Sequence, residues 1–274
     1  MQQKKLTPLL TKIYSTLKNK KIYFLAIIIN AFLFTYYYGY RGIFPIDSFL
    51  IYDAGYKVLN NVHPFKDYWS ITGPLLDYVQ ATLFLLFKVN WFSYVLHAAL
   101  INCLLAAISY YFYLKLGLNK NYSLIYALGI SILAYPTIGT PFVDYHAVIF
   151  SLLSIIFLIL AFNKDKKKFW FFSSLFLIFS FFSKQIPSAY LIILLFLLIS
   201  VYFFFINKKS NNNYLFFFFG GIITLFSFYI LFIGNEIPIK NFLIQYIFYP
   251  ISIGDDRVTS LSFDLKNAFF QFKF

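Results

Sequence analysis

The chain has 274 residues, of which 61% are hydrophobic and only 12% are charged. Soluble domains are about half apolar and a quarter charged, so this composition excludes an ordinary soluble protein. The net charge of +13 comes from lysines in short tracts between apolar segments, a distribution typical of membrane topology signals and not of a nucleic-acid-binding surface. We therefore predict a membrane protein with no nucleic-acid partner.

The chain begins with a basic segment, residues 1–22, which holds six lysines and no acidic residue. The positive-inside rule predicts that this segment is cytoplasmic. No small-residue cleavage site follows the first apolar segment, which is typical of an uncleaved anchor. Seven apolar segments are near the ~20 residues needed to cross ~30 Å of hydrocarbon. They are 23–40, 92–115, 122–138, 143–162, 168–183, 186–206 and 213–235. We predict an all-α polytopic membrane protein with about seven transmembrane helices.

An eighth apolar segment, residues 74–89, does not fit this topology. Lysines at 115–120, 164–168 and 208–209 indicate cytoplasmic turns, so this segment cannot also cross. It opens with Gly73-Pro74 and carries Asp77 and Gln80 in its first turns. We predict an interfacial or re-entrant helix on the outer side. Residues 23–235 then form a transmembrane domain with outer loops at 41–73, 138–143 and 183–187, and residues 236–274 an outer amphipathic region.

The first outer loop is rich in acidic residues. It is predicted to contain an amphipathic helix near 48–60. Four of the ten acids of the chain lie between residues 45 and 78, at Asp47, Asp53, Asp67 and Asp77. Acidic residues contribute little to membrane orientation, so their enrichment suggests chemistry. We expect Asp53 and Asp77 to be helix-surface or capping residues, and Asp47 to be the candidate general base.

Asp47 follows the first predicted span by a few residues, at the level of the lipid head groups. A partly desolvated carboxylate there suits a general base for a hydroxyl, or a metal ligand. The alternative is a helix N-cap, because Asp47 precedes the predicted helix and Asp is a favoured cap. Position alone does not separate these interpretations.

The second and third outer loops also carry ionisable side chains. Asp144 and His146 begin the span at 143–162, where ionisable groups usually face a cavity or a partner; the alternative is an N-cap with an interfacial histidine. Lys184 and Gln185 lie in a turn before Pro187. A lone lysine there suits a phosphate anion, and the alternative is snorkelling to the interface.

Other candidates are less specific. Lys66, Asp67 and Trp69 lie in HPFKDYW, whose aromatic residues suit either an interfacial belt or a platform for a sugar ring. Lys66-Asp67 is otherwise a solvated pair worth ~0–1 kcal/mol. Arg257 follows Asp255-Asp256 and is a second candidate anion ligand. Nucleotide-binding and metalloprotease motifs such as a Walker loop, GxGxxG or HExxH are absent from the sequence.

The order of these motifs resembles the GT-C superfamily of membrane glycosyltransferases, in particular its protein O-mannosyltransferase-like and lipid A aminoarabinose transferase-like groups. Asp47 takes the position of the first-loop catalytic acid, although the family often has Asp-Glu where this chain has Asp47-Ser48. Three further matches are FKDYWSITGPLLDY at 65–78, GTPFVDYHAVIF at 139–150 and FSKQIPSAY at 182–190. In the last two, Asp144 matches the acid of the second outer loop and Lys184 matches a lysine that faces the carrier phosphate.

The resemblance implies a glycosyltransferase that moves a sugar from a polyprenyl-phosphate donor to a lipid or glycan acceptor on the outer, periplasmic face of a bacterial inner membrane. Asp47 and Asp144 would be catalytic, and Lys184, Arg257 and Lys66 would bind the donor phosphate. The remaining substrate contacts would come from Asp67, Trp69, His146 and Gln185. A divalent metal ion, held by Asp47 and His146, is the one cofactor considered. Because family members continue with further spans, the resemblance implies a chain truncated at its C-terminus. The alternative is a lipid or polysaccharide flippase without catalytic activity.

Overall fold

The computed structural model describes residues 20–42, 47, 49–134, 139–202, 205 and 212–260. Every regular element that these residues form is a helix, which confirms the predicted all-α class. Residues 1–19 of the predicted cytoplasmic segment and residues 261–274 of the predicted amphipathic region lie outside the described residues, as do the side chains of 255–260.

Among the described residues, four helices are long and apolar enough to cross a membrane. They are α2 (Lys20–Gly39), α5 (Trp91–Lys115), α7 (Val143–Lys164) and α10 (Leu215–Gly234). Each falls on a segment predicted to span. The other three predicted spans correspond to shorter helices, α6 (Lys120–Leu133), α8 (Lys167–Ser183) and α9 (Gln185–Val201).

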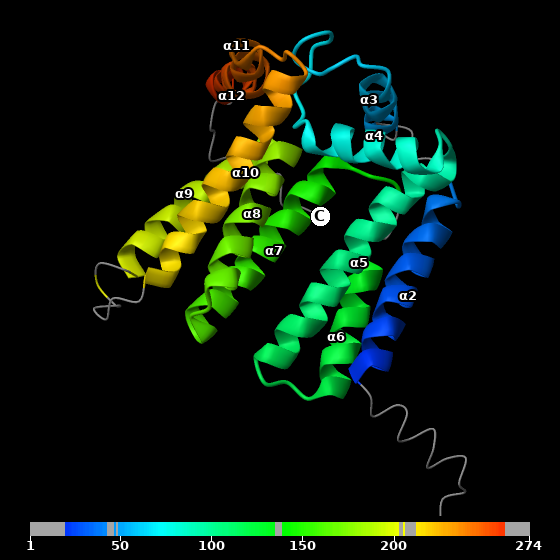
Figure 1. The fold of residues 1–274 in the computed structure, drawn as a ribbon, viewed down its shortest axis with the longest axis vertical. Coiled ribbons are helices and arrows are strands. Elements are labelled where there is room, and N and C mark those ends of the chain that lie inside the picture. Colours follow the sequence, from blue (N-terminus) through cyan, green and yellow to red (C-terminus); the bar gives the residue numbers. More distant parts are fainter. Residues whose placement is uncertain are drawn as a thin grey trace, which may run out of the picture.

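The helices of the bundle, α2 and α5 to α10, form two groups that run side by side (Figure 1). α2, α5 and α6 pack around small residues such as Ala31, Ala106 and Ala127, and α7 to α10 pack around a larger aromatic core. Polar side chains also join neighbouring helices inside each group. Asn102 on α5 donates to Thr35 Oγ1 on α2 at 2.8 Å. Such small residues and interhelical hydrogen bonds are typical of packing in membranes, where burial gives little driving force.

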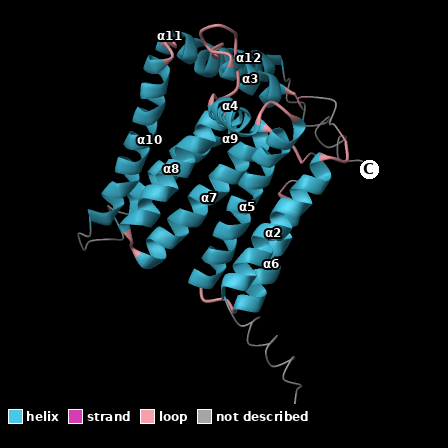
Figure 2. Ribbon diagram, turned by 45° about the vertical axis from the view of Figure 1, so that its right-hand side comes forward, coloured by secondary structure: helices cyan, strands magenta, loops and turns pink. Residues whose placement is uncertain are grey.

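Short helices gather at one end of this bundle (Figures 1 and 2). α3 (Leu50–Leu59) and α4 (Leu75–Phe87) are close to the predicted helices at 48–60 and 74–89. The chain beyond α10 forms α11 (Ile239–Phe242), a π-helix η3 (Leu243–Phe248) and α12 (Tyr249–Ser260) at the same end. α4 lies across the ends of the long helices and is packed under α3 through the buried side chains of Ile51 and Leu76.

Candidate functional site

A cavity of about 740 Å³ lies where the short helices meet the ends of α7, α8 and α9. Its walls come from α3, α4, α12, the segment 68–72, the first turn of α7 and the junction between α8 and α9. The ionisable groups that line it are Asp47, Asp53, Lys57, Asp77, Asp144 and Lys184. The structure therefore brings Asp47, Asp144 and Lys184, which lie far apart in the sequence, to one cavity.

Asp144 and Lys184 form an ion pair on one wall of this cavity. Asp144 lies in the first turn of α7, and Lys184 is an extended residue between the last residue of α8 and the first of α9. Both side chains are more than a third exposed, at 41% and 35%. An ion pair in such surroundings contributes only about 0–1 kcal/mol, so an anionic ligand can displace Asp144 from Lys184.

Two close backbone contacts bring these residues into place. Gly73 lies so near α8 that a Cβ atom would be 1.9 Å from the Phe182 carbonyl oxygen, and its N–H donates to Ser183 O at 3.1 Å. The segment before α4 is thereby held directly beside Lys184. In the same way Gly139, with φ +60°, would place a Cβ 2.1 Å from Gly39 N at the end of α2. A side chain at Gly73 would push the segment before α4 away from the end of α8, and one at Gly139 would push the segment before α7 away from α2.

Asp47 is an exposed residue on the cavity in the left-handed backbone region, with φ 63°. Its carbonyl accepts a hydrogen bond from the Leu50 N–H at 3.2 Å. α3 begins at Leu50 and has Phe49 in the N-cap position, so the alternative interpretation of Asp47 as the helix cap is wrong. Asp is one of the few residue types that adopts this backbone region readily.

Trp69 and Gln185 also line the cavity. Trp69 is 54% exposed, and its ring packs edge-on against Tyr249 of α12, with ring centroids 5.2 Å apart. Gln185 donates to Ile71 O at 3.3 Å, which ties the start of α9 to the same segment. An exposed aromatic pair beside carboxylates is a common way to bind a sugar ring.

Other predicted site residues lie away from the cavity. Lys66 binds Glu236 at 3.1 Å and the Asn235 carbonyl at 3.2 Å, and so fastens the segment 63–72 to the end of α10. Asp67 accepts from the His63 N–H at 2.7 Å and closes a local turn. Neither Lys66 nor Asp67 is among the described residues that line the cavity. The side chain of Arg257 lies outside the described residues.

His146 is buried between helices and does not belong to the described lining of the cavity. Its Nδ1 lies 3.0 Å from the Phe142 carbonyl, and its ring packs edge-on against His97 at 4.9 Å between centroids. A metal ion shared by Asp47 and His146 does not fit this arrangement. The described residues contain no group of three or more His, Cys, Asp or Glu side chains that could hold a metal ion.

Asp77 is the residue that sequence reasoning misjudged. It lines the cavity but is only 1% exposed, so the expectation of a helix-surface or capping residue is wrong. Its Oδ2 accepts a long hydrogen bond from Tyr68 Oη at 3.4 Å. Burial raises the pKa of Asp77 to about 8. The sequence does carry a signal, because Asp77 shares one helical face with Gln80, Ala81 and Phe84, all of which are buried.

Asp53, in contrast, is the surface residue that the sequence predicts. Its carboxylate binds Lys57, four residues later on α3, at 2.7 Å. The Lys57 ammonium also lies over the ring of Tyr68, 4.8 Å from its centroid. Asp53 and Lys57 therefore neutralise each other as an ion pair on the wall of the cavity.

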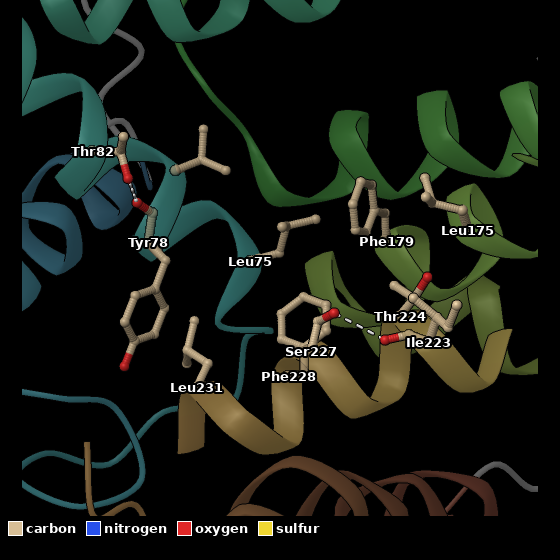
Figure 3. Close-up of a pocket in the computed structure, with 11 residues that line it drawn as sticks. Leu75, Tyr78, Thr82, Leu175, Phe179, Ile223, Thr224, Ser227, Phe228 and Leu231 are labelled. Atoms are coloured by element: carbon tan, nitrogen blue, oxygen red, sulfur yellow. Dashed lines mark hydrogen bonds between the residues drawn. The ribbon is translucent and has the colours of Figure 1, made fainter. Parts of the chain in front are cut away.

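A second hollow of about 330 Å³ lies between α4, α8 and α10 (Figure 3). Tyr78, Phe179 and Phe228 are among the residues on its walls. Two of its hydroxyl groups are turned to their own helices, because Thr82 donates to Tyr78 O and Ser227 donates to Ile223 O. The hollow is therefore an apolar groove. α4 contributes to both hollows, with Asp77 on the cavity and Tyr78 in the groove.

Comparisons with protein-family models, with curated proteins and with solved structures find no match to this chain. The cavity combines exposed carboxylates, two lysines that are each paired with a partly exposed carboxylate, and an aromatic pair. These groups suit a ligand that has both hydroxyl groups and a phosphate.

Proposed function

We propose that this chain is a membrane glycosyltransferase that moves a sugar from a polyprenyl-phosphate donor to a hydroxyl group of a lipid or glycan acceptor. The observation that carries the proposal is the presence of Asp47, Asp144 and Lys184 on one cavity at the end of a bundle of apolar helices. Transfer of this kind requires a base for the acceptor and a cation for the leaving phosphate.

In the proposed reaction Asp47 is the general base. Its carboxylate takes the proton of the acceptor hydroxyl while the oxygen attacks the anomeric carbon from the face opposite the phosphate. The bond between that carbon and the phosphate oxygen breaks, and its electron pair leaves with the polyprenyl phosphate. The products are the glycoside with inverted configuration, the carrier phosphate with one more negative charge, and protonated Asp47.

Lys184 would stabilise the charge that develops on the leaving phosphate. Asp144 holds the ammonium on the cavity wall before the donor binds, and the phosphate then takes its place. A fixed cation lowers the barrier because it need not be reoriented during the reaction. Trp69 and Tyr249 would pack against the sugar ring, and Gln185 would contact its hydroxyl groups. Arg257, on the same helix as Tyr249, is proposed as a second phosphate ligand.

The two hollows beside α4 support a lipid-linked donor. A polar cavity and an apolar groove on one helix suit a ligand with a charged head and a hydrocarbon tail. We further propose that α6, α8 and α9 also cross the bilayer, which gives seven spans. At 14 to 17 residues these helices reach about 21–26 Å, so the local hydrocarbon would be thinner than ~30 Å. The proposed location is a bacterial inner membrane with the N-terminus cytoplasmic and the cavity outside.

The test is sugar transfer in membranes that contain the full-length chain, with a panel of polyprenyl-phosphate sugars. Asp47→Asn should reduce turnover by a factor of about 10² to 10⁴, the usual contribution of a general base. Asn accepts a positive φ as readily as Asp, so this substitution leaves the backbone at position 47 unstrained. The matched control is Asp53→Asn, which removes another exposed carboxylate from the same cavity and should retain most activity.

Three results would overturn parts of this proposal. Equal turnover by wild type and Asp47→Asn would exclude Asp47 as the base. Movement of intact lipid-linked sugar across the membrane without transfer would establish a flippase instead. Failure of every donor in the panel, with a folded chain in the membrane, would reject the glycosyltransferase.

A further inference from the structure

Asp77 is a carboxyl group placed where ionisation is costly. It lies in the first turn of α4, beside Leu76, which is also fully buried. The positive end of a helix favours a carboxylate by only about 0.3–1 kcal/mol, much less than the cost of removing a charge from water. Burial therefore decides its state and raises the pKa of Asp77 to about 8. Near neutral pH the group is mainly a carboxylic acid, which both donates and accepts hydrogen bonds.

The groups around Asp77 leave part of it unsatisfied. Tyr68 donates to Oδ2 at 3.4 Å, whereas Oδ1 has no hydrogen-bond partner among the residues that the structure describes. The charged groups whose fields act on Asp77 are Asp53 and Lys57 on α3, and these are bound to each other. An unsatisfied buried carboxyl oxygen costs about 1–3 kcal/mol. Asp77 is one of the residues that line the cavity, although Oδ1 itself is covered, so a small turn of the carboxyl group would let a ligand in the cavity supply the missing partner.

We propose that Asp77 and Tyr68 form an uncharged subsite of the cavity, which binds a hydroxyl group of a sugar or other polyol through the Asp77 carboxyl. The subsite is formed by the first turn of α4 and by Tyr68 in the segment before it, whereas the Asp144–Lys184 pair comes from α7 and the junction before α9. The identification of the ligand as a sugar rests on the proposed function. The subsite would contact the sugar of the donor or acceptor and not the phosphate.

The chemistry of the subsite selects a hydroxyl group over the alternatives. A protonated carboxyl and a phenol offer no net charge to an inorganic anion or a metal cation. A sugar hydroxyl both donates and accepts, and so does a protonated carboxyl, so one ligand group can satisfy Oδ1 whichever atom carries the proton. Trp69 and Tyr249 line the same cavity and provide the apolar surface that the face of a sugar ring requires.

The test compares how wild type and an Asp77 variant each bind a sugar and its analogues that lack one hydroxyl group. The full-length chain is reconstituted in lipid nanodiscs, and the affinities of methyl glycopyranosides and of their monodeoxy analogues are measured by NMR saturation transfer. For wild type, removal of one particular hydroxyl should weaken binding about 5- to 20-fold, the size of one hydrogen bond to a buried group. For Asp77→Ala, that analogue and its parent should bind equally. Asp77→Asn keeps a donor and an acceptor and should restore most of the difference.

This comparison distinguishes a ligand contact from a role in stability. If Asp77 only stabilised the fold, its substitution would change the affinity of every analogue by the same factor. Equal loss for all analogues would overturn the subsite, and so would a deoxy preference that is unchanged in Asp77→Ala. No measurable binding of any parent glycoside at its solubility limit would also overturn it. A preference that depends on Asp77 in a protein without transferase activity would uphold the subsite while rejecting the proposed reaction.

Discussion

Asp144 on α7 and Lys184 between α8 and α9 form an ion pair across the wall of the cavity, although 40 residues separate them in the chain. Close backbone contacts lie near both residues in the chain, because Gly73 packs against Phe182 just before Lys184, and Gly139, a few residues before Asp144, packs against Gly39. Because both charges are partly exposed, the pair adds little to stability and leaves Lys184 open to exchange. It is suited to hold a cation ready for an anionic ligand.

We predict that Lys184→Gln weakens donor binding and leaves the fold intact. Loss of a charged hydrogen bond to phosphate, worth about 1.5–3 kcal/mol, should raise KM for a polyprenyl-phosphate sugar roughly 10- to 100-fold. Lys184→Arg keeps the charge and should recover most of the loss. Transfer kinetics in reconstituted vesicles measure both effects, and an unchanged KM in Lys184→Gln would remove Lys184 from the phosphate site.

Lys66→Gln provides the matched comparison, since Lys66 is also a lysine near this end of the bundle but binds Glu236 and not the cavity. Glu236 is 84% exposed, so we expect a change of less than about 1 kcal/mol in the free energy of unfolding. KM for the donor should stay within about twofold of wild type. A rise in KM as large as that of Lys184→Gln would restore Lys66 as a phosphate ligand.

Gly73→Ala should destabilise the protein, because its Cβ would lie 1.9 Å from the Phe182 carbonyl oxygen. Backbone cannot move aside as a flexible side chain can, so we expect a loss of about 1–3 kcal/mol, as in an overpacked core. Thermal unfolding in detergent measures the loss. The control is Gly129→Ala on α6, where a Cβ meets nothing within 4 Å and should stabilise the helix by up to about 1 kcal/mol. Equal melting temperatures for the two variants would contradict the close contact.

Much of this end of the molecule follows from local patterns. The helices at 50–59 and 75–87 are close to where charge and periodicity predict them, and Lys184 lies in the predicted turn. Neighbouring residues set these features, so sequence alone reveals them. Only four of the seven predicted spans are clearly long enough to cross, because α6, α8 and α9 have 14, 17 and 17 residues, fewer than the ~20 that ~30 Å of hydrocarbon requires.

The interior of the site depends on contacts between distant segments. Lys66 and Lys184 both lie in predicted outer loops, so the sequence predicts the same role for both. Only Lys184 lines the cavity, because Lys66 binds Glu236, 170 residues away in the chain. His146 is likewise held away from the cavity, because it is buried between helices and packs against His97 of another helix. Asp77 is buried because α3 lies over α4, a packing that no single segment predicts.

The burial of Asp77 predicts a pH dependence of stability. In the unfolded chain its carboxyl ionises near pH 3.9, whereas in the folded chain the pKa is about 8. Between these values the folded state holds a proton that the unfolded state has lost, so the free energy of unfolding falls as pH rises, by up to about 1.4 kcal/mol per pH unit. The fall should end above pH 8, where both states are ionised.

Asp77→Asn removes this contribution, because an amide does not titrate. The melting temperature of the variant should therefore rise relative to wild type as the pH is raised from about 5 to about 8, and the difference should then level off. Tyr68, Asp53 and Lys57, which face Asp77, are unchanged in both proteins and cancel in the comparison to first order. A difference that is constant from pH 5 to 9 would mean that Asp77 is already ionised in the folded protein.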